Sequence, residues 1–288
     1  MIEYKRKTND FPIRLKEGEV PYFYFPLLEN TRQVTHGFST RLGGVSKEEY
    51  TSMNLASNRT DSIENVRENY RRICKAMGMK AEDAVVSKQT HTTNIRIVHR
   101  EDAGKGIFVD RGYEDIDGLM TDEPNLPLVT LYADCVPLYF FDPVKRVIAL
   151  SHSGWRGTVN HMGEVTIEKM NQTYGCKSED ILACIGPSIC VDCYEVGEEV
   201  AGEFLDKFSP QEVTRILQKG KIEGKYQLDL WKANEIILKN AGITNEHLAV
   251  TNVCTCCNPD LLFSHRYTKG KRGNLGAFLC LKNEKVEG

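Results

Sequence analysis

Long apolar runs are absent from this chain of 288 residues. Its most apolar window, residues 126–141, is interrupted by Asp134. A membrane-spanning helix needs about 20 consecutive apolar residues, so we expect no membrane segment. The chain is charged from Glu3 onward with no apolar stretch behind it, which is not the pattern of a secretory signal. We therefore expect a cytoplasmic protein.

A strong net charge is also absent. The 37 lysines and arginines nearly balance the 40 aspartates and glutamates, which leaves a net charge of −3. Such a chain has no global attraction to nucleic acid or to an anionic membrane. Two short basic runs, 4–7 and 269–272, are typical of solvated surface. We expect neither nucleic acid nor membrane as a partner.

Cysteine is not scarce, since the chain has ten. Without an export signal, a reducing compartment and free thiols are favoured over disulfides. One group comprises Cys184, Cys190 and Cys193, and a second is the run 254–257. The spacing Cys190-x-x-Cys193 is suggestive of zinc, but we do not expect the run Cys254-Thr-Cys-Cys257 to supply the two-residue gap of a zinc knuckle, so packed free thiols are favoured. A second metal site built from both groups is the alternative.

Short apolar runs alternate with amphipathic stretches along the chain. The periodicity predicts helices over 61–77, 157–174, 195–208 and 229–241. It predicts strands over 84–86, 95–98, 136–141, 146–150, 181–185, 247–253 and 275–281. The segment 100–125 is expected to be a loop, and 36–46 a turn-rich run. Hairpins mixed with crossovers favour an α/β (α+β) fold with mixed sheets, flanking helices and one compact domain over 1–288.

The strands 136–141 and 146–150 are joined by the turn pair Asp142-Pro143, which predicts a hairpin. In an antiparallel hairpin the start of one strand lies beside the end of the next. Cys135 and His152 should therefore meet at one edge of a sheet. A thiol beside an imidazole indicates either a nucleophile with its base or two ligands of a soft metal.

His91, in a polar break between two strands, can supply a third ligand. With Cys135 and His152 it would fill three corners of a tetrahedral zinc site. The open corner is typical of a catalytic zinc, which lowers the pKa of its bound water to about 7. The chain has only seven histidines and no His-x-His pair, too few for the oxygen-reducing cluster of a multicopper oxidase.

Six motifs, ordered along the chain, together resemble one family. They are His36-Gly-Phe-Ser-Thr-Arg-Leu-Gly-Gly-Val-Ser46, Gln89-Thr-His91, Ala133-Asp-Cys-Val-Pro-Leu138, His152-Ser-Gly-Trp-Arg-Gly157, Ile185-Gly-Pro-Ser-Ile189 and Cys193-Tyr-Glu-Val196. The family is the multicopper polyphenol oxidase (laccase) domain family, also described as purine nucleoside phosphorylases of the YlmD/YfiH type. The resemblance runs from residue 36 to about residue 280.

This resemblance implies a zinc ion, and catalysis, at His91, Cys135 and His152. It implies cleavage of adenosine, inosine, guanosine and methylthioadenosine by phosphate to base and ribose 1-phosphate, together with adenosine deaminase activity. The substrates would be small purine nucleosides and phosphate, and the protein a monomer or homodimer. The implied fold is related to cysteine-hydrolase-like toxin domains.

Substrate contacts are expected from the glycine-rich motifs. Arg41, Arg156 and Arg266 can hold phosphate, because arginine forms bidentate contacts with it. Phe38 can stack on a purine, and Asp134 can handle protons during deamination. Structural salt bridges and core packing are the alternatives for these residues.

Three other functions remain open at this point. A cysteine-type hydrolase, acting in peptidoglycan precursor editing, would use Cys135 as nucleophile and His152 as base. A polyphenol oxidase would bind Cu2+ at the same residues. A binding module would have no catalysis at all. Zinc is favoured because His91 adds a ligand that a Cys-His dyad does not need.

Overall fold

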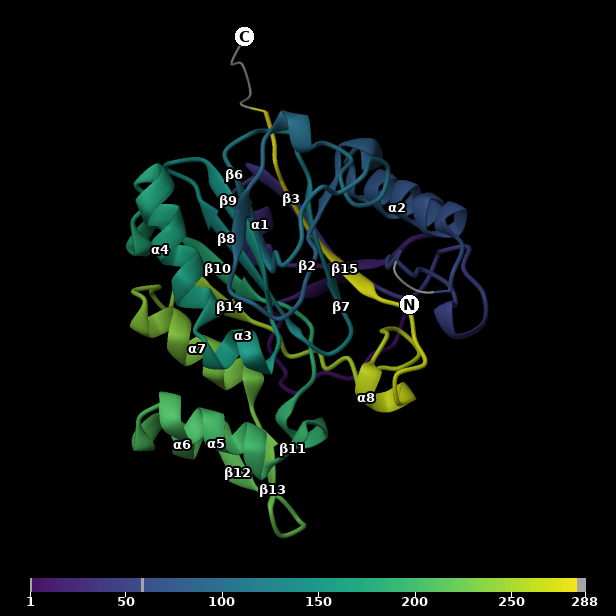
Figure 1. Ribbon diagram of the computed structural model, residues 1–288. Coiled ribbons are helices and arrows are strands. Elements are labelled where there is room, and N and C mark those ends of the chain that lie inside the picture. The colour runs from purple at the N-terminus through teal and green to yellow at the C-terminus, as the bar shows by residue number, and fades with distance from the viewer. Residues whose placement is uncertain (1, 58–59, 284–288) are drawn as a thin grey trace.

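Two six-stranded β-sheets face each other and carry helices on their outer faces (Figure 1). The computed structural model describes residues 2–57 and 60–283. In the first sheet the strand order is β1 (Arg14–Lys16), β2 (Tyr22–Tyr24), β3 (Val34–Ser39), β15 (Leu275–Leu281), β7 (Leu128–Tyr132) and β4 (Val85–Val86). In the second sheet it is β14 (Leu248–Val250), β10 (Leu182–Ile185), β8 (Val136–Asp142), β9 (Val147–Ser153), β6 (Gly118–Thr121) and β5 (Ile95–Ile97).

A small third sheet has the order β11 (Glu195–Gly197), β13 (Lys225–Leu228) and β12 (Leu217–Lys219). The α-helices are α1 (Pro26–Glu29), α2 (Ile63–Met77), α3 (Trp155–Val159), α4 (Met162–Tyr174), α5 (Glu198–Lys207), α6 (Pro210–Ile216), α7 (Leu230–Asn240) and α8 (His265–Thr268). Short 3-10 turns join several of these elements, among them η5 (Val191–Cys193).

The two large sheets contain both parallel and antiparallel pairs. β4 with β7, β5 with β6 and β10 with β14 are parallel, whereas the other pairs of these sheets are antiparallel. The predicted mixed-sheet α+β fold is thus confirmed. Among the described residues no helix is both long and apolar enough to cross a membrane.

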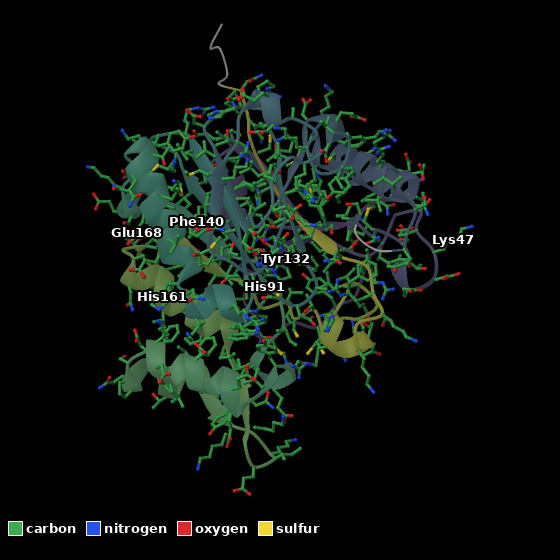
Figure 2. All side chains as sticks on the ribbon, in the orientation of Figure 1. Lys47, His91, Tyr132, Phe140, His161 and Glu168 are labelled. Carbon is green, nitrogen blue, oxygen red and sulfur yellow. The ribbon has the colours of Figure 1, made fainter. Side chains whose placement is uncertain are left out.

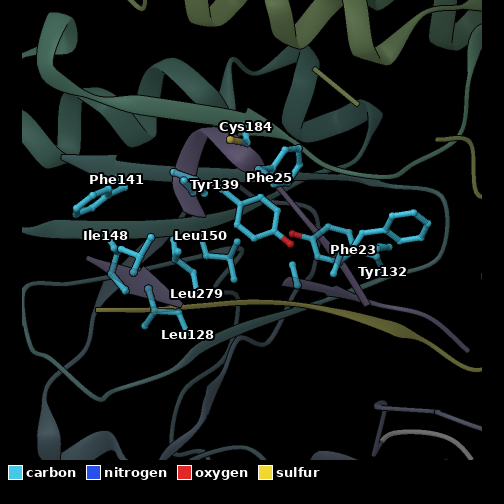
Figure 3. Close-up of a cluster of buried hydrophobic side chains, with 14 of the residues drawn as sticks. Phe23, Phe25, Leu128, Tyr132, Tyr139, Phe141, Ile148, Leu150, Cys184 and Leu279 are labelled. Atoms are coloured by element: carbon cyan, nitrogen blue, oxygen red, sulfur yellow. The ribbon is translucent and has the colours of Figure 1, made fainter. Parts of the chain in front are cut away.

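Strand β8 is apolar from Val136 to Phe141 because both of its faces are covered. Tyr139 and Phe141 point into the space between the two sheets, where they join Leu128 and Leu279 of the first sheet (Figure 3). The alternate residue Phe140 belongs to a second core beneath helices α4 and α7. Burial on two faces explains why the sequence shows a continuous apolar run here rather than alternation.

Helix α2 covers the outer face of the first sheet. Tyr70 and Met77 lie in a third core together with Phe278 of β15. Gly78 ends the helix in a left-handed conformation at φ 75°. The N-cap is Ser62, whose hydroxyl accepts from the Asn65 amide, so the helix begins at Ile63, two residues after the predicted start at residue 61.

The helix predicted over 157–174 is two helices. It starts earlier, as α3, and is broken before α4 by His161, whose φ of 56° is left-handed. Gly163 then packs closely on α7, since a Cβ there would lie 2.9 Å from Leu238. The break lets α3 and α4 follow different directions over the core.

Helix α7, which is capped by Asp229, agrees with the helix predicted over 229–241. Three other expectations need correction. The helix predicted from residue 195 begins at Glu198, because 195–197 form strand β11. The predicted loop 100–125 contains β6, which pairs with both β5 and β9. The first part of the turn-rich run 36–46 belongs to the buried strand β3. In all three places a segment forms a strand because it pairs with strands that are distant in the sequence.

Candidate metal centre and its cavity

The β8–β9 hairpin brings Cys135 next to His152, as the sequence predicts. Val136 pairs with Ser153 and Pro137 with His152. At the other end of the hairpin, an oxygen of Asp142 accepts the amides of the turn. The register therefore places the residue before β8 beside the end of β9.

His91 joins this pair from a distant loop. The ligand atoms of His91, Cys135 and His152 all lie within 4.8 Å of one another, and the two imidazole centroids are 5.0 Å apart. His91 lies in the β4–β5 loop and Cys135 lies between β7 and β8, so both are on connections between the two sheets. His152 lies in β9 of the second sheet. Figure 2 labels His91 near the middle of the molecule, close to Tyr132.

Asp117 organises two of these three residues, and we did not predict this role. Its carboxylate accepts from His152 Nδ1 at 2.8 Å and from the His91 amide at 3.1 Å. It also accepts the amides of Thr90 and Thr92. With Nδ1 turned to Asp117, His152 presents Nε2 to the cluster, the arrangement usual for a metal-bound histidine. The only signal in the sequence is an Asp-Gly pair at the end of a polar segment.

Gln89 anchors the loop that carries His91. Its side-chain amide donates to the Leu131 carbonyl and accepts the Leu131 amide, each at 2.7 Å. The side chain thus continues the hydrogen bonding of β7, and His91 follows in a left-handed turn at φ 67°. Gln89 therefore has a structural role in the Gln-Thr-His motif, which is to hold the loop of His91 against β7.

The pKa values of His152, His91 and Asp117 depend on one another, because the three side chains lie close together. Burial lowers the pKa of His152, but Cys135 and Asp117 beside it outweigh burial and raise that pKa to about 9. Burial and the neighbouring His152 lower the pKa of His91. Burial raises the pKa of Asp117, but the hydrogen bond from His152, the charge of His152 and the amides of Thr90 and Thr92 together outweigh burial, and the net shift is downward. A divalent cation bound here would displace the proton of His152 toward solvent.

Gly154 leaves the space that the ligands occupy. A Cβ at this position would lie 2.8 Å from His91 Nδ1 and 3.1 Å from Cys135 Sγ. Its φ of −69° suits any residue, so the requirement for glycine is purely steric. Gly154 is therefore a steric requirement of the candidate metal site.

The donor set fits zinc. Two imidazoles and one thiolate are ligands that zinc accepts in a tetrahedral arrangement, with one position remaining for substrate or solvent. The three residues border a cavity of about 650 Å³, which is also lined by aromatic and basic side chains. A site of this form can bind a small polar molecule and polarise it.

Not all predicted substrate residues reach this cavity. Phe38 is fully buried between the sheets, 5.8 Å from the Tyr132 ring, so the predicted stacking on a purine was wrong. Arg41 donates to the carbonyls of Thr51 and Pro259 and lies over the Phe263 ring, outside the cavity lining. Phe38 and Arg41 therefore make structural contacts and do not line the cavity.

Arg266 does line the cavity, and Arg156 lies next to it. Arg266 lies over the Tyr194 ring and donates to the Glu195 carbonyl. Arg156 is exposed and lies over the ring of Trp155, which is itself a lining residue. These two arginines keep their predicted position near the site.

Both carboxylate oxygens of Asp134 accept hydrogen bonds from other parts of the chain. One carboxylate oxygen accepts from the Thr255 hydroxyl at 2.6 Å, and the other accepts the Arg266 amide at 2.7 Å. The residue is in a left-handed conformation at φ 89° and is 8% exposed. This geometry indicates that Asp134 positions the Arg266 helix and the loop at Thr255 around Cys135.

Sequence reasoning missed several residues of the cavity wall. Trp155 and Tyr194 provide aromatic surface, and Lys88 and Arg111 provide positive charge. The Arg111 guanidinium is held by the carbonyls of Val86 and Gly106. Trp155 and Tyr194 lie within two of the family motifs, whereas Lys88 and Arg111 lie outside them, and only the folded chain shows that all four converge.

The family described as "Multi-copper polyphenol oxidoreductase laccase" matches residues 35–282 of this chain. The chain belongs to this family. It is 34% identical over 256 residues to the protein named Purine nucleoside phosphorylase YlmD of Bacillus subtilis, covering 88% of this chain and 91% of that protein. It is 36% identical over 248 residues to a protein named Purine nucleoside phosphorylase of Deinococcus radiodurans, covering 86% and 89%.

Solved structures agree with this assignment. The crystal structure of YlmD from Geobacillus stearothermophilus superposes with a TM-score of 0.86 at 30% identity, covering 93% of this chain and 99% of that chain. The hypothetical protein YfiH of Bacillus licheniformis superposes with a TM-score of 0.88 at 34% identity, covering 95% and 100%. The family that the motifs predict is confirmed, and so is the α+β fold with mixed sheets.

Proposed function

We propose that this protein is a zinc-dependent purine nucleoside phosphorylase acting on small nucleosides and phosphate. The observation that carries the proposal is the convergence of His91, Cys135 and His152 at the wall of a cavity that is also basic and aromatic. Cavities of this size are typical of small-molecule sites. The relatives named as purine nucleoside phosphorylases support the substrate class.

His91, Cys135 and His152 would hold the zinc ion, and Asp117 would orient His152 by accepting its Nδ1 proton. Bound zinc supplies a Lewis acid that polarises an oxygen of the substrate. Trp155 and Tyr194 offer faces on which a purine ring can stack.

Phosphate needs cations to bring it close to the anomeric carbon of the ribose. Arg266 is our first candidate, since its amide is fixed by Asp134 and its side chain lines the cavity. Lys88 and Arg111 lie on the same cavity and add positive charge. Guanidinium groups bind phosphate through paired hydrogen bonds.

The direct test is incubation of zinc-loaded protein with inosine and phosphate, with chromatographic measurement of hypoxanthine and ribose 1-phosphate. We expect His91→Ala to lose at least 100-fold in kcat/KM and to lose zinc, on the order expected for removal of a metal ligand. His99→Ala is the matched control, because His99 is also exposed but pairs with Glu123 outside the cavity. Undiminished turnover in His91→Ala would overturn the metal assignment.

Deamination of adenosine at the same site is the second activity that we propose. It requires no phosphate, so adenosine should yield inosine and ammonia in phosphate-free buffer. Adenine and ribose 1-phosphate should form only after phosphate is added. An absence of ammonia with active enzyme would remove this activity and leave phosphorolysis standing.

One observation favours a different class, a cysteine hydrolase. Cys135, His152 and Asp117 are arranged as a nucleophile, a base and an orienting carboxylate. His91 within ligand distance of the other two favours metal over this triad. If activity survives complete chelation but is lost on thiol alkylation, the triad is correct and a relationship to cysteine hydrolases gains support.

Copper could occupy the same His-Cys-His set, and the family description mentions it. Among the described residues, however, no other metal-ligating group contains a histidine. A multicopper oxidase needs a further cluster, so we give zinc preference over copper. Oxygen uptake with a phenolic substrate would reverse that preference.

A further inference from the structure

Four cysteines converge at a second place, outside the cavity lining. Cys190 and Cys193 lie on the segment after β10, and Cys254 and Cys257 lie on the turn after β14. All four sulfur atoms lie within 4.8 Å of one another, and those of Cys193 and Cys257 are 3.5 Å apart. None of these cysteines forms a disulfide.

This arrangement has the dimensions of a tetrathiolate metal site. With zinc–sulfur bonds of about 2.3 Å, tetrahedral geometry requires sulfurs about 3.8 Å apart. Thiols that serve only as core packing have no reason to meet in a group of four. Cys74, Cys176, Cys184 and Cys280 illustrate that second situation, since each is buried away from this group.

The backbone around the sulfurs also suits thiolates. The Cys190 amide donates to Cys254 Sγ at 3.3 Å. The Cys193 amide contacts the sulfur of Cys190, and the Cys257 amide contacts that of Cys254. Hydrogen bonds from backbone amides to a charged sulfur stabilise the anion. In each loop the backbone amide of the second cysteine of the pair thus stabilises the thiolate of the first.

Charge compensation comes from the N-terminal segment. The ammonium of Lys7 lies beside Cys190 and Cys257 and forms a 2.7 Å ion pair with Asp192. A divalent ion with four thiolates is net negative, so a cation at this position stabilises the filled site. Cys190 and Cys254 are almost fully buried, which shields the site from solvent.

The sequence contains the matching motif twice, although we favoured packed free thiols over a second metal site. Cys190-x-x-Cys193 is one pair. Cys254-x-x-Cys257 is the other, with Cys256 as one of the two intervening residues. Cys256 and Cys184 lie outside the group of four. Two such pairs are the usual ligand spacing of a structural zinc site.

We propose that Cys190, Cys193, Cys254 and Cys257 bind one structural zinc ion, separate from the site at Cys135. Four protein ligands leave no open position, which distinguishes a structural from a catalytic zinc. The ion fastens the segment after β10 to the turn after β14. It acts independently of whether the phosphorolysis proposal holds.

The fastened loops also frame the catalytic cavity. The Ile189 amide donates to the Asp134 carbonyl, and the Thr255 hydroxyl donates to the Asp134 carboxylate. The Thr255 amide donates to the Ser188 carbonyl, which joins the two loops directly. Both loops thereby hold the residue that precedes Cys135. The tetrathiolate zinc is a positioning device for that part of the cavity.

Metal content of protein purified under reducing conditions tests the proposal. Elemental analysis of Cys193→Ser and Cys257→Ser should show about one zinc ion per chain less than wild type. Cys256→Ser is the matched control, because it lies in the same loop and should keep the wild-type content. Cys135→Ala should lose the other ion and keep this one, which separates the two sites.

If the serine variants fail to fold, native mass spectrometry of Cys135→Ala provides the readout on a chain with all four cysteines. A retained zinc ion in that variant supports the proposal, and a metal-free chain overturns it. Replacement of zinc by cobalt should give the intense thiolate-to-metal absorption of a tetrathiolate site. Two disulfides, seen as a loss of four hydrogen masses, or iron in place of zinc, would also overturn it.

Discussion

At the scale of single residues, Asp117 shows how one carboxylate can position the residues of a candidate metal site. It accepts the Nδ1 proton of His152 and the backbone amides of three consecutive residues that include His91. One side chain therefore fixes both the ring of one ligand and the loop of another. Partners of this kind contribute strongly to metal affinity without contacting the metal.

We expect Asp117→Asn to weaken zinc binding by about 10–100-fold, because both carboxylate oxygens accept hydrogen bonds and an amide nitrogen cannot accept in place of either one. Competition with a fluorescent chelator measures this affinity. Asp115→Asn is the control in the same loop, since Asp115 is exposed and accepts only peripheral contacts such as the Thr90 hydroxyl. Equal zinc affinity in Asp117→Asn and Asp115→Asn would contradict this role.

His36 is a residue of the family motif whose role is in stability. Its Nε2 accepts the Phe25 amide at 2.8 Å, and its Nδ1 is buried without a partner. Burial lowers its pKa from 6.5 to about 3. The folded chain therefore resists protonation that the unfolded chain accepts. The resulting contribution to stability is complete above the unfolded pKa and is lost progressively as the pH falls below it.

Between about pH 6 and pH 4, this histidine should make the free energy of unfolding fall by up to about 1.4 kcal/mol per pH unit. His36→Gln keeps an acceptor near Nε2 but does not titrate. We expect the wild-type and variant curves, measured by urea unfolding of metal-free protein, to diverge across this window. Parallel curves would show that His36 does not titrate differently in the two states.

At the scale of elements, local patterns could predict the β8–β9 hairpin and the meeting of Cys135 with His152. Apolar runs, a turn pair and the geometry of antiparallel strands were sufficient. The role of Asp117 and the burial of Phe38 could not be predicted in this way. Both depend on which strands pair across the sheets and on how the sheets pack, and neither leaves a short-range trace in the sequence.

The junction between β9 and α3 provides a test at this scale. Gly154→Ala places a methyl group against His91 and Cys135, and we expect at least a 10-fold loss of zinc affinity, about 1.4 kcal/mol. Gly202→Ala in α5 is the control, because nothing lies within 4 Å of its added Cβ. That variant should bind zinc normally and gain about 0.5–1 kcal/mol in unfolding free energy. Calorimetric titration and urea unfolding measure the two quantities.

At the scale of the whole molecule, the candidate metal ligands lie where the chain passes from one large sheet to the other. His91 follows a strand of the first sheet, and Cys135 connects a strand of the first sheet to one of the second. The packing between the sheets therefore sets the distances at the site. The family motifs predict which residues gather, but the facing of the two sheets is a property of the complete core.

The contact between the sheets and the metal site can be separated experimentally. Tyr139 of β8 donates its hydroxyl to the Gly37 carbonyl of β3 at 2.9 Å, across the core shown in Figure 3. Tyr139→Phe should lower the unfolding free energy of metal-free protein by about 0.5–1.5 kcal/mol. Zinc affinity should stay unchanged, because Asp117 and the hairpin register still hold the ligands. If zinc affinity falls together with the unfolding free energy, the geometry of the zinc site depends on the packing between the two sheets.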